Sequence, residues 1–309
     1  MSDIKLFETR NGEVRELEGQ SVEVEKSLQN LIEKNSRAFL GVRFLASEYR
    51  TSDLHKGRID TLGLDENGYP VIIEYKRSMN QNVINQGLFY LDWLVDHKAN
   101  FSELVREKIG SEAVDEIDWS GLRLLCIAGG FNRYDSHAVR RINRNIELLR
   151  YRRYGDELLL LELINAASQD EGRSQSPAKG KSTSGERKTV QEALDDADPE
   201  LQDRFEAVKS YCENLGDDVQ FKTLQQYFAF KRLKNFACVE PKPRQGDLVI
   251  HVKADFDDPD LLDRIEKDDS LRDVRDVGHY GTGNLELRLR SDDDFDRVDD
   301  LIVDSYERS

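Results

Sequence analysis

Cysteine is scarce in this chain of 309 residues. The three cysteines, Cys126, Cys212 and Cys238, are odd in number, far apart and in no C-x-x-C spacing. A disulfide framework needs paired cysteines, and a cysteine zinc site needs closely spaced ones, so the sequence argues against both. We therefore expect a reducing environment and a cytoplasmic protein.

Long apolar runs are also absent. No stretch approaches the roughly 20 apolar residues that a helix needs to cross a bilayer, so we expect no membrane association. The first residues, MSDIKLFETRNGEV, lack the basic and apolar regions of a signal peptide. The five histidines form no cluster at metal-ligand spacing.

Positive charge is in deficit, with a net charge of −16, but the deficit is uneven. Residues 1–168 hold 23 Lys+Arg and 27 Asp+Glu, a net of −4. Residues 189–309 hold 17 and 31, a net of −14. Because the acidity belongs to the C-terminal part, the N-terminal part can still present a basic face to nucleic acid.

Residues 168–188 separate these two parts. Their sequence, SQDEGRSQSPAKGKSTSGERK, is rich in Ser, Gly and charge and has no apolar periodicity. This composition is typical of a flexible linker. We therefore predict two domains, 1–167 and 189–309.

The most informative stretch covers residues 57–76 and reads GRIDTLGLDENGYPVIIEYK. Residues 58–64 and 71–76 are rich in apolar and β-branched residues, which is typical of strands. Residues 65–70 contain Asp, Asn, Gly and Pro, which is typical of a turn. The stretch therefore predicts a β-hairpin.

The register of this hairpin brings acidic residues together. If the loop is centred on Asn67, residues whose numbers sum to 134 face each other, so Asp60 lies opposite Glu74. Alternation along the strand puts Glu74 and Lys76 on one face. The pattern therefore predicts two carboxylates and an amine on one face of the hairpin.

Two neighbouring carboxylates repel and need a partner. Mg²⁺ or Mn²⁺ can supply it, because such hard cations bind one or two carboxylates, keep several waters and also take phosphate oxygens. A nearby lysine can then orient or activate a water. The alternative is a surface hairpin in which Lys76 is ion-paired with Glu74 or Asp60.

The order G-R-I-D, hairpin, E-Y-K resembles the core of the PD-(D/E)XK nuclease superfamily, and in particular its NucS/RecB-like endonuclease domains. The resemblance implies an α/β fold with a restriction-endonuclease-like mixed sheet flanked by helices. It implies that Asp60 and Glu74 bind the metal and that Lys76 assists the hydrolytic water. The sequence departs from the family name at Ile59, which stands where the proline would be.

Two further positions agree with the resemblance. Glu25 lies in VEKSLQNLIEKN, a predicted helix from residue 21, and would be a third metal ligand. Gln86 and Tyr90 form a Q-x-x-x-Y pair on a predicted helix up to about His97, where Gln86 would act in catalysis and Tyr90 would contact DNA. Considered alone, Glu25 fits a solvated helix flank, and Tyr90 fits a core residue with Gln86 at its edge.

Arginines are frequent between residues 140 and 153. A guanidinium group can bind phosphate with two hydrogen bonds, so we expect Arg140, Arg141 and Arg144, with Arg58 of the hairpin, to contact DNA. The alternative is a solvated face on which arginines pair with nearby carboxylates.

Further elements of the first domain follow from pattern. Residues 39–49 and the apolar run 122–128 are predicted strands, residues 136–143 a helix, and residues 145–163 a second hairpin.

The C-terminal domain is predicted to be a smaller α+β unit. Asp198 and Pro199 suit the start of a helix, and Ser291 is predicted to cap a final helix up to Tyr306. The segment HYGTGN at 279–284 lacks the lysine and spacing of a phosphate loop, so we expect a turn. The arrangement resembles a small domain of unknown function that accompanies such nucleases.

These features predict a divalent-metal-dependent nuclease that hydrolyses DNA phosphodiester bonds, in DNA repair or in defence against foreign DNA. The expected partner is DNA, and a homodimer or a protein bound by the C-terminal domain are further expectations. Two alternatives stay open: a nuclease-like protein that binds nucleic acid without cutting, and an interaction protein that acts through its acidic domain.

Overall fold

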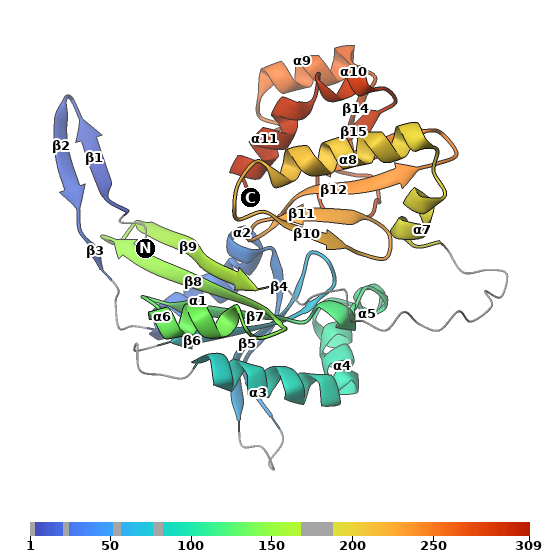
Figure 1. Cartoon of the computed structure of the whole chain (residues 1–309). Coiled ribbons are helices and arrows are strands. Elements are labelled where there is room, and N and C mark those ends of the chain that lie inside the picture. The colour runs from blue at the N-terminus through green and yellow to red at the C-terminus, as the bar shows by residue number, and fades with distance from the viewer. Residues whose placement is uncertain (1–3, 21–24, 52–56, 77–82, 168–187) are drawn as a thin grey trace. The chain divides into compact units, whose positions relative to one another are not determined.

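The computed structural model describes residues 4–20, 25–51, 57–76, 83–167 and 188–309 (Figure 1). The chain divides into two compact units, Met1–Ser174 and Gln175–Ser309. The predicted linker 168–188 lies outside the described residues except for Lys188. Within the described ranges, no helix has the length and apolar character required to cross a membrane.

The first unit is built on a seven-stranded sheet with the order β3-β8-β7-β6-β5-β4, in which β9 pairs with β8. Strands β6, β7 and β8 are parallel, and the other pairs are antiparallel. The strands are β3 (Gly19–Gln20), β4 (Val42–Arg50), β5 (Arg58–Asp65), β6 (Pro70–Lys76), β7 (Arg123–Ala128), β8 (Asn145–Tyr154) and β9 (Leu158–Ala167). This mixed sheet with its helices confirms the predicted fold class.

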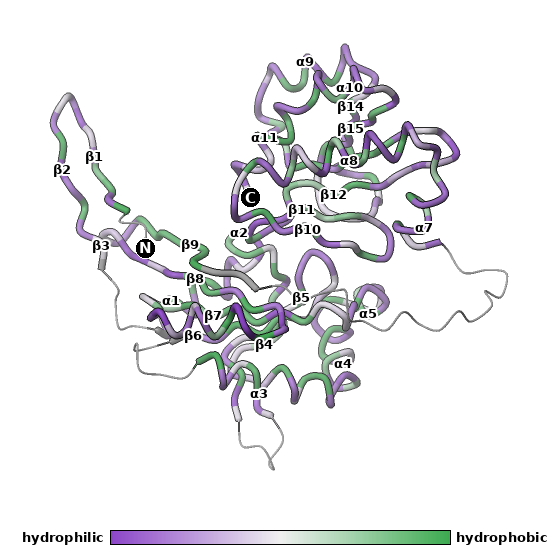
Figure 2. The backbone as a smooth tube through the Cα atoms, viewed as in Figure 1, coloured by the Kyte–Doolittle hydropathy of each residue, from purple (hydrophilic) through white to green (hydrophobic). Residues whose placement is uncertain are grey.

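Helices accompany the sheet, and those between β6 and β7 and between β7 and β8 form the crossovers that parallel strands need. They are α1 (Glu25–Lys34), α2 (Ser36–Leu40), α3 (Val83–Asp96), α4 (Lys98–Lys108), α5 (Glu112–Asp115), the 3₁₀ turn η1 (Trp119–Gly121) and α6 (Arg133–Val139). Helix α3 packs closely on β7, since a Cβ added to Gly87 would lie 2.5 Å from Leu124 Cδ1. Figure 2 shows hydrophobic and hydrophilic residues alternating along the helices.

Two predicted boundaries were wrong. The strand expected at 39–49 starts only at Val42, because α2 occupies the preceding residues and ends at Gly41 with a φ of 64°. The helix expected at 136–143 is α6, which starts earlier, at Arg133. It starts there because Asn132 and Asp135 form a capping box around its first turn.

The N-terminal strands β1 (Leu6–Arg10) and β2 (Glu13–Leu17) form a separate two-stranded sheet. Asn11 and Gly12 connect them with φ values of 50° and 85°. Positive φ at both central positions is the geometry that Asn-Gly favours in a hairpin.

A buried charge cluster fixes the far end of the central hairpin. Arg123 Nε and Nη2 each donate to Glu147, at 2.9 Å, and Arg123 Nη1 donates to Asp65 Oδ2 at 2.7 Å. All three side chains are buried. Burial alone would lower the pKa of Arg123, but Glu147 and Asp65 raise it above its ordinary value. The guanidinium therefore stays charged and joins β5, β7 and β8.

The second unit has a six-stranded antiparallel sheet in the order β10-β11-β12-β13-β15-β14. Its elements are α7 (Val190–Asp195), α8 (Pro199–Glu213), β10 (Gln220–Thr223), β11 (Phe228–Lys231), β12 (Asn235–Lys242), β13 (Asp247–Val252), α9 (Pro259–Lys267), β14 (Leu271–Asp273), β15 (Leu285–Leu289), α10 (Asp292–Phe295) and α11 (Asp299–Glu307). Helix α8 starts at Pro199 with Asp198 as its cap, as predicted.

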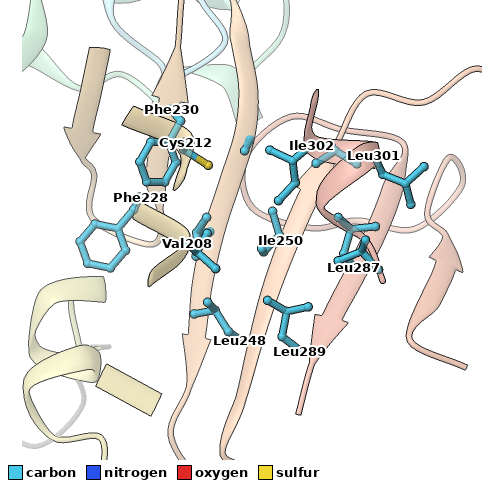
Figure 3. Close-up of a cluster of buried hydrophobic side chains, with 14 of the residues drawn as sticks. Val208, Cys212, Phe228, Phe230, Leu248, Ile250, Leu287, Leu289, Leu301 and Ile302 are labelled. Carbon is cyan, nitrogen blue, oxygen red and sulfur yellow. The ribbon is translucent and has the colours of Figure 1, made fainter. Parts of the chain in front are cut away.

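Figure 3 shows the core of this unit, where side chains from α8 and α11 meet those from β11, β13 and β15. The smaller α+β unit agrees with the predicted fold class. The single final helix expected from Ser291 to Tyr306 was wrong, because α10 ends at Phe295 and α11 starts at Asp299.

Candidate active site

The hairpin of β5 and β6 has the predicted register. Thr61 faces Ile73 and Leu62 faces Ile72, so the facing numbers sum to 134. The turn is held locally, because Asp65 Oδ1 accepts from the backbone N–H groups of Asn67 and Tyr69 at 2.8 and 2.9 Å. Local turn chemistry thus fixes which residues of the two strands face each other.

Beyond Thr61 and Ile73 the regular pairing ends and side chains join the strands. The backbone N–H of Asp60 donates to Glu74 Oε1 at 3.1 Å. In return, the backbone N–H of Tyr75 donates to Asp60 Oδ2 at 3.0 Å. Each carboxylate therefore accepts a hydrogen bond from the opposite strand, and the structure brings Asp60 and Glu74 together.

Glu74 lies in an unusual electrostatic environment. It is only 1% exposed, and burial raises the pKa of its carboxyl to about 9, with a further rise from the charge of Asp60. The hydrogen bond from the Asp60 backbone lowers that pKa, but it does not compensate for the burial. A buried carboxyl next to another carboxylate is stabilised in its charged form only if a cation lies close by.

The pair fits a hard divalent cation. Mg²⁺ and Mn²⁺ prefer carboxylate oxygens and need only one or two of them when waters and phosphate complete the coordination shell. Among the residues that the structure describes, His, Cys, Asp and Glu form no group of three or more arranged to hold a metal. Further ligands would therefore be water, phosphate or a side chain outside the described set.

Two of the predicted site residues are side chains of this undescribed kind. Lys76 ends β6, two residues after Glu74, and Glu25 begins α1. Their side chains are outside the described residues. Their roles as water-activating lysine and third metal ligand stay predictions.

Gln86 and Tyr90 lie on α3. Tyr90 contacts the start of β5, and Gln86 contacts Tyr90. Tyr90 is 5% exposed, and its hydroxyl accepts from the backbone N–H of Arg58 at 3.1 Å and from Gln86 Nε2 at 3.1 Å. Its ring packs so closely on Gly57 that an added Cβ would lie 2.7 Å from Cε1. Tyr90 is therefore buried and holds the start of β5 two residues before Asp60, and its contact with DNA stays a prediction.

The other residues that were predicted to contact DNA lie in two different places. Arg58 is exposed, with its Nε 2.5 Å from Glu48 Oε2. Arg140, Arg141 and Arg144 are exposed and directly precede β8. The start of β8, Asn145, is level with Val71, whereas Glu74 lies three residues further along β6. The structure therefore places these three arginines toward the opposite edge of the parallel strands, and their contact with DNA stays a prediction.

Sequence reasoning missed an arginine and a tyrosine closer to the carboxyl edge. Arg133 and Tyr134 begin α6, five and six residues after Ala128, which pairs with Lys76. Tyr134 is 68% exposed, and the Arg133 guanidinium lies 4.8 Å from its ring centre. An exposed aromatic ring stacked with a guanidinium is the kind of surface on which nucleic-acid bases and phosphates bind.

Sequence reasoning also missed Gln29 on α1. It is 4% exposed, and its Nε2 donates to the backbone carbonyl of Asp60 at 3.0 Å. The available signal was a polar residue between the apolar Leu28 and Ile32 of the helix predicted from residue 21. Such a position is buried by helical periodicity, so its amide needs partners.

The segment at 279–284 forms a loop against the sheet of the second unit. Gly281 has a φ of 80°, and an added Cβ would lie 2.5 Å from Cys238 Cβ. His279 stacks on the buried His251 with ring centres 4.1 Å apart. Burial lowers the pKa of His251 to about 4, so this ring is neutral at neutral pH.

Comparison with known proteins finds a family model that matches part of the chain. Residues 190–309 match the family described as Domain of unknown function (DUF5655). The chain is similar to a protein of Haemophilus influenzae described as uncharacterized, with 29% identity over 303 residues, which cover 93% of this chain and 94% of the relative. Neither match states an activity.

Two solved structures show weaker likeness. A repair endonuclease from Pyrococcus abyssi is 20% identical, with a TM-score of 0.29 over 42% of this chain and 49% of its own. A complex of EndoMS with double-stranded DNA is 20% identical, with a TM-score of 0.26 over 43% of this chain and 47% of its own. The chain spans about half the length of each of these structures.

Proposed function

We propose that this protein is a divalent-metal-dependent nuclease that hydrolyses phosphodiester bonds in DNA. The observation that carries the proposal is the arrangement of Asp60 and Glu74, in which each carboxyl group accepts a backbone hydrogen bond from the opposite strand and the Glu74 carboxyl is buried. This arrangement costs free energy in an ordinary hairpin and suits a protein that binds a cation.

Asp60 and Glu74 would hold Mg²⁺ or Mn²⁺, with Glu25 as the third protein ligand. When bound, the ion supplies Lewis-acid chemistry, polarising a phosphate oxygen and lowering the pKa of a water molecule. Lys76 would orient or deprotonate the attacking water, and Gln86 would orient the water or the target strand. Arg58, Arg133 and Tyr134 offer exposed groups to the DNA.

A digestion panel tests this proposal. Plasmid and oligonucleotide DNA are incubated with the purified protein in Mg²⁺, Mn²⁺ or EDTA, beside Asp60→Ala and Lys76→Ala. We expect cutting only with a divalent ion and only by the wild-type protein. Intact DNA in every metal would favour a nuclease-like protein that binds without cutting. Absence of any DNA or divalent-ion binding would favour an interaction protein.

The charge difference between the two units gives a second expected result. Residues 1–168, of net charge −4, should bind DNA more tightly at low salt than the full chain, because residues 189–309, of net charge −14, repel phosphate and compete for basic residues. The effect should shrink as salt rises, since the screening length is about 8 Å at physiological ionic strength.

A salt titration of both proteins on one labelled duplex measures this effect. Weaker binding by residues 1–168 at every salt concentration would contradict the repulsion. It would show that the C-terminal unit itself contributes to DNA binding.

A further inference from the structure

Asp60 lies at a gap in the register that β5 makes with its two neighbouring strands. Along β4 the register passes from Tyr49 opposite Ile59 to Ser47 opposite Thr61, and it skips Glu48 and Asp60. Glu48, within β4, has a φ of 54°, a left-handed conformation that is uncommon for a residue other than glycine. Toward β6 the register begins only at Thr61. At such a gap, side chains can act as hydrogen-bond partners of the peptide groups.

Gln29 supplies one of these partners. Its Nε2 donates to the Asp60 carbonyl at 3.0 Å, while the Asp60 N–H donates to Glu74. The Gln29 amide is itself anchored, because Nε2 also lies 2.9 Å from Glu33 Oε1. Its Oε1 accepts from Lys26 Nζ at 3.2 Å. Two other residues of α1 therefore hold the Gln29 amide in the orientation in which it donates to the strand.

Glu33 extends the connection by one residue. Its Oε1 accepts a hydrogen bond at 2.6 Å from Oγ1 of Thr61, the residue that directly follows Asp60 in β5. Helix α1 therefore holds two consecutive residues of the strand through two of its own side chains, Gln29 and Glu33. The same helix begins with Glu25, one turn before Gln29.

We propose that Gln29 is a positioning residue that fixes the backbone of Asp60 relative to helix α1 and thereby sets the affinity of the site for its divalent ion. The inference rests on the proposed function, because the ion is the one that Asp60 and Glu74 would bind. Groups that orient metal ligands typically change metal affinity or activity by about 10–100-fold when they are replaced.

The test compares Gln29→Met with Asn30→Met. Methionine keeps the length of glutamine but cannot donate to the Asp60 carbonyl. Asn30 is the next residue of α1 and is exposed, so it controls for the same change on the same helix. Binding of Mn²⁺ to the full-length proteins is measured by titration calorimetry without DNA, and cutting is measured against Mn²⁺ concentration.

We expect the Kd for Mn²⁺ to rise at least about tenfold in Gln29→Met. Cutting by this variant should recover at saturating Mn²⁺, and Asn30→Met should behave as the wild type. A purely structural Gln29 would lower the free energy of unfolding and leave the Kd of the folded protein unchanged, and that result would overturn the inference. If Gln29→Met does not fold, Gln29→Asn is used, whose shorter amide should also raise the Kd.

The same titration separates the two proposals. Equal Kd values for Mn²⁺ in the wild type and in Gln29→Met would refute the positioning role of Gln29 and leave the proposed metal site standing. Wild-type protein that binds no Mn²⁺ refutes the proposed metal site, and the role of Gln29 with it.

Discussion

Glu74→Gln is expected to abolish cutting and, in the absence of divalent ions, to stabilise the fold at alkaline pH. The loss of activity should be about a thousand-fold, because a bound ion contributes about 4 kcal/mol of transition-state stabilisation. The gain in stability has a different cause, which is the burial of the Glu74 carboxyl next to Asp60.

The direction of the pH effect follows from the raised pKa. Glu74 titrates at about 9 in the folded protein, against an ordinary value of 4.5. Its protonated form therefore contributes stability that is complete below about pH 4.5 and is lost as pH rises through about 9. The loss is at most about 1.4 kcal/mol per pH unit over this interval. Glutamine resembles the protonated acid, so the variant should lack this part of the pH dependence.

Tryptophan fluorescence measures this effect cleanly. The two tryptophans, Trp93 and Trp119, both belong to the first unit, so their signal follows the unfolding of the unit that carries Glu74. Urea unfolding from pH 5 to 9 in EDTA compares the wild type, Glu74→Gln and the control Asp92→Asn, whose side chain is 75% exposed. Mg²⁺ should stabilise the wild type and the control but not Glu74→Gln.

Equal pH dependence of all three proteins would mean that Glu74 is already ionised without a metal. Full cutting by Glu74→Gln would remove Glu74 from the proposed site.

Arg123→Met is expected to destabilise the first unit by about 3–5 kcal/mol at pH 7. The substitution removes the guanidinium that Asp65 and Glu147 share and leaves two buried carboxylates without a partner. Uncompensated buried charge is among the few causes of such a large loss. Arg123→Lys should also destabilise, because an ammonium group cannot donate twice to Glu147 in the same plane.

The matched control is Arg43→Met. Arg43 Nη2 lies 2.6 Å from Glu116 Oε2, but the Glu116 side chain is 53% exposed. Loss of this ion pair should therefore lower the free energy of unfolding by only about 0–1 kcal/mol. The deficit of Arg123→Met should shrink as pH falls toward 5, since burial raises the pKa of an unpaired carboxyl and protonation removes its charge. If tryptophan fluorescence shows that Arg123→Met loses less than about 1 kcal/mol of unfolding free energy at pH 7, the buried cluster contributes little to stability.

The sequence alone determined the features that depend on near neighbours. The turn between β5 and β6 is closed by Asp65 and centred on Asn67, so its residues fix the register and hence the meeting of Asp60 with Glu74. Alternation along a strand and turn chemistry are local properties, and a sequence displays them directly. The helix start at Asp198 and Pro199 has the same origin.

Only the tertiary structure decided which distant residues meet at the site and at the far end of the hairpin. Gln29 reaches Asp60 across 31 positions, and Arg123 joins Asp65 and Glu147 from 58 and 24 positions away. Tyr90 was expected to contact DNA, yet it is buried by packing on Gly57 and holds Arg58. Such contacts depend on how helices pack on the sheet. Periodicity shows which face of an element is buried, but it does not show which partner a buried polar group meets.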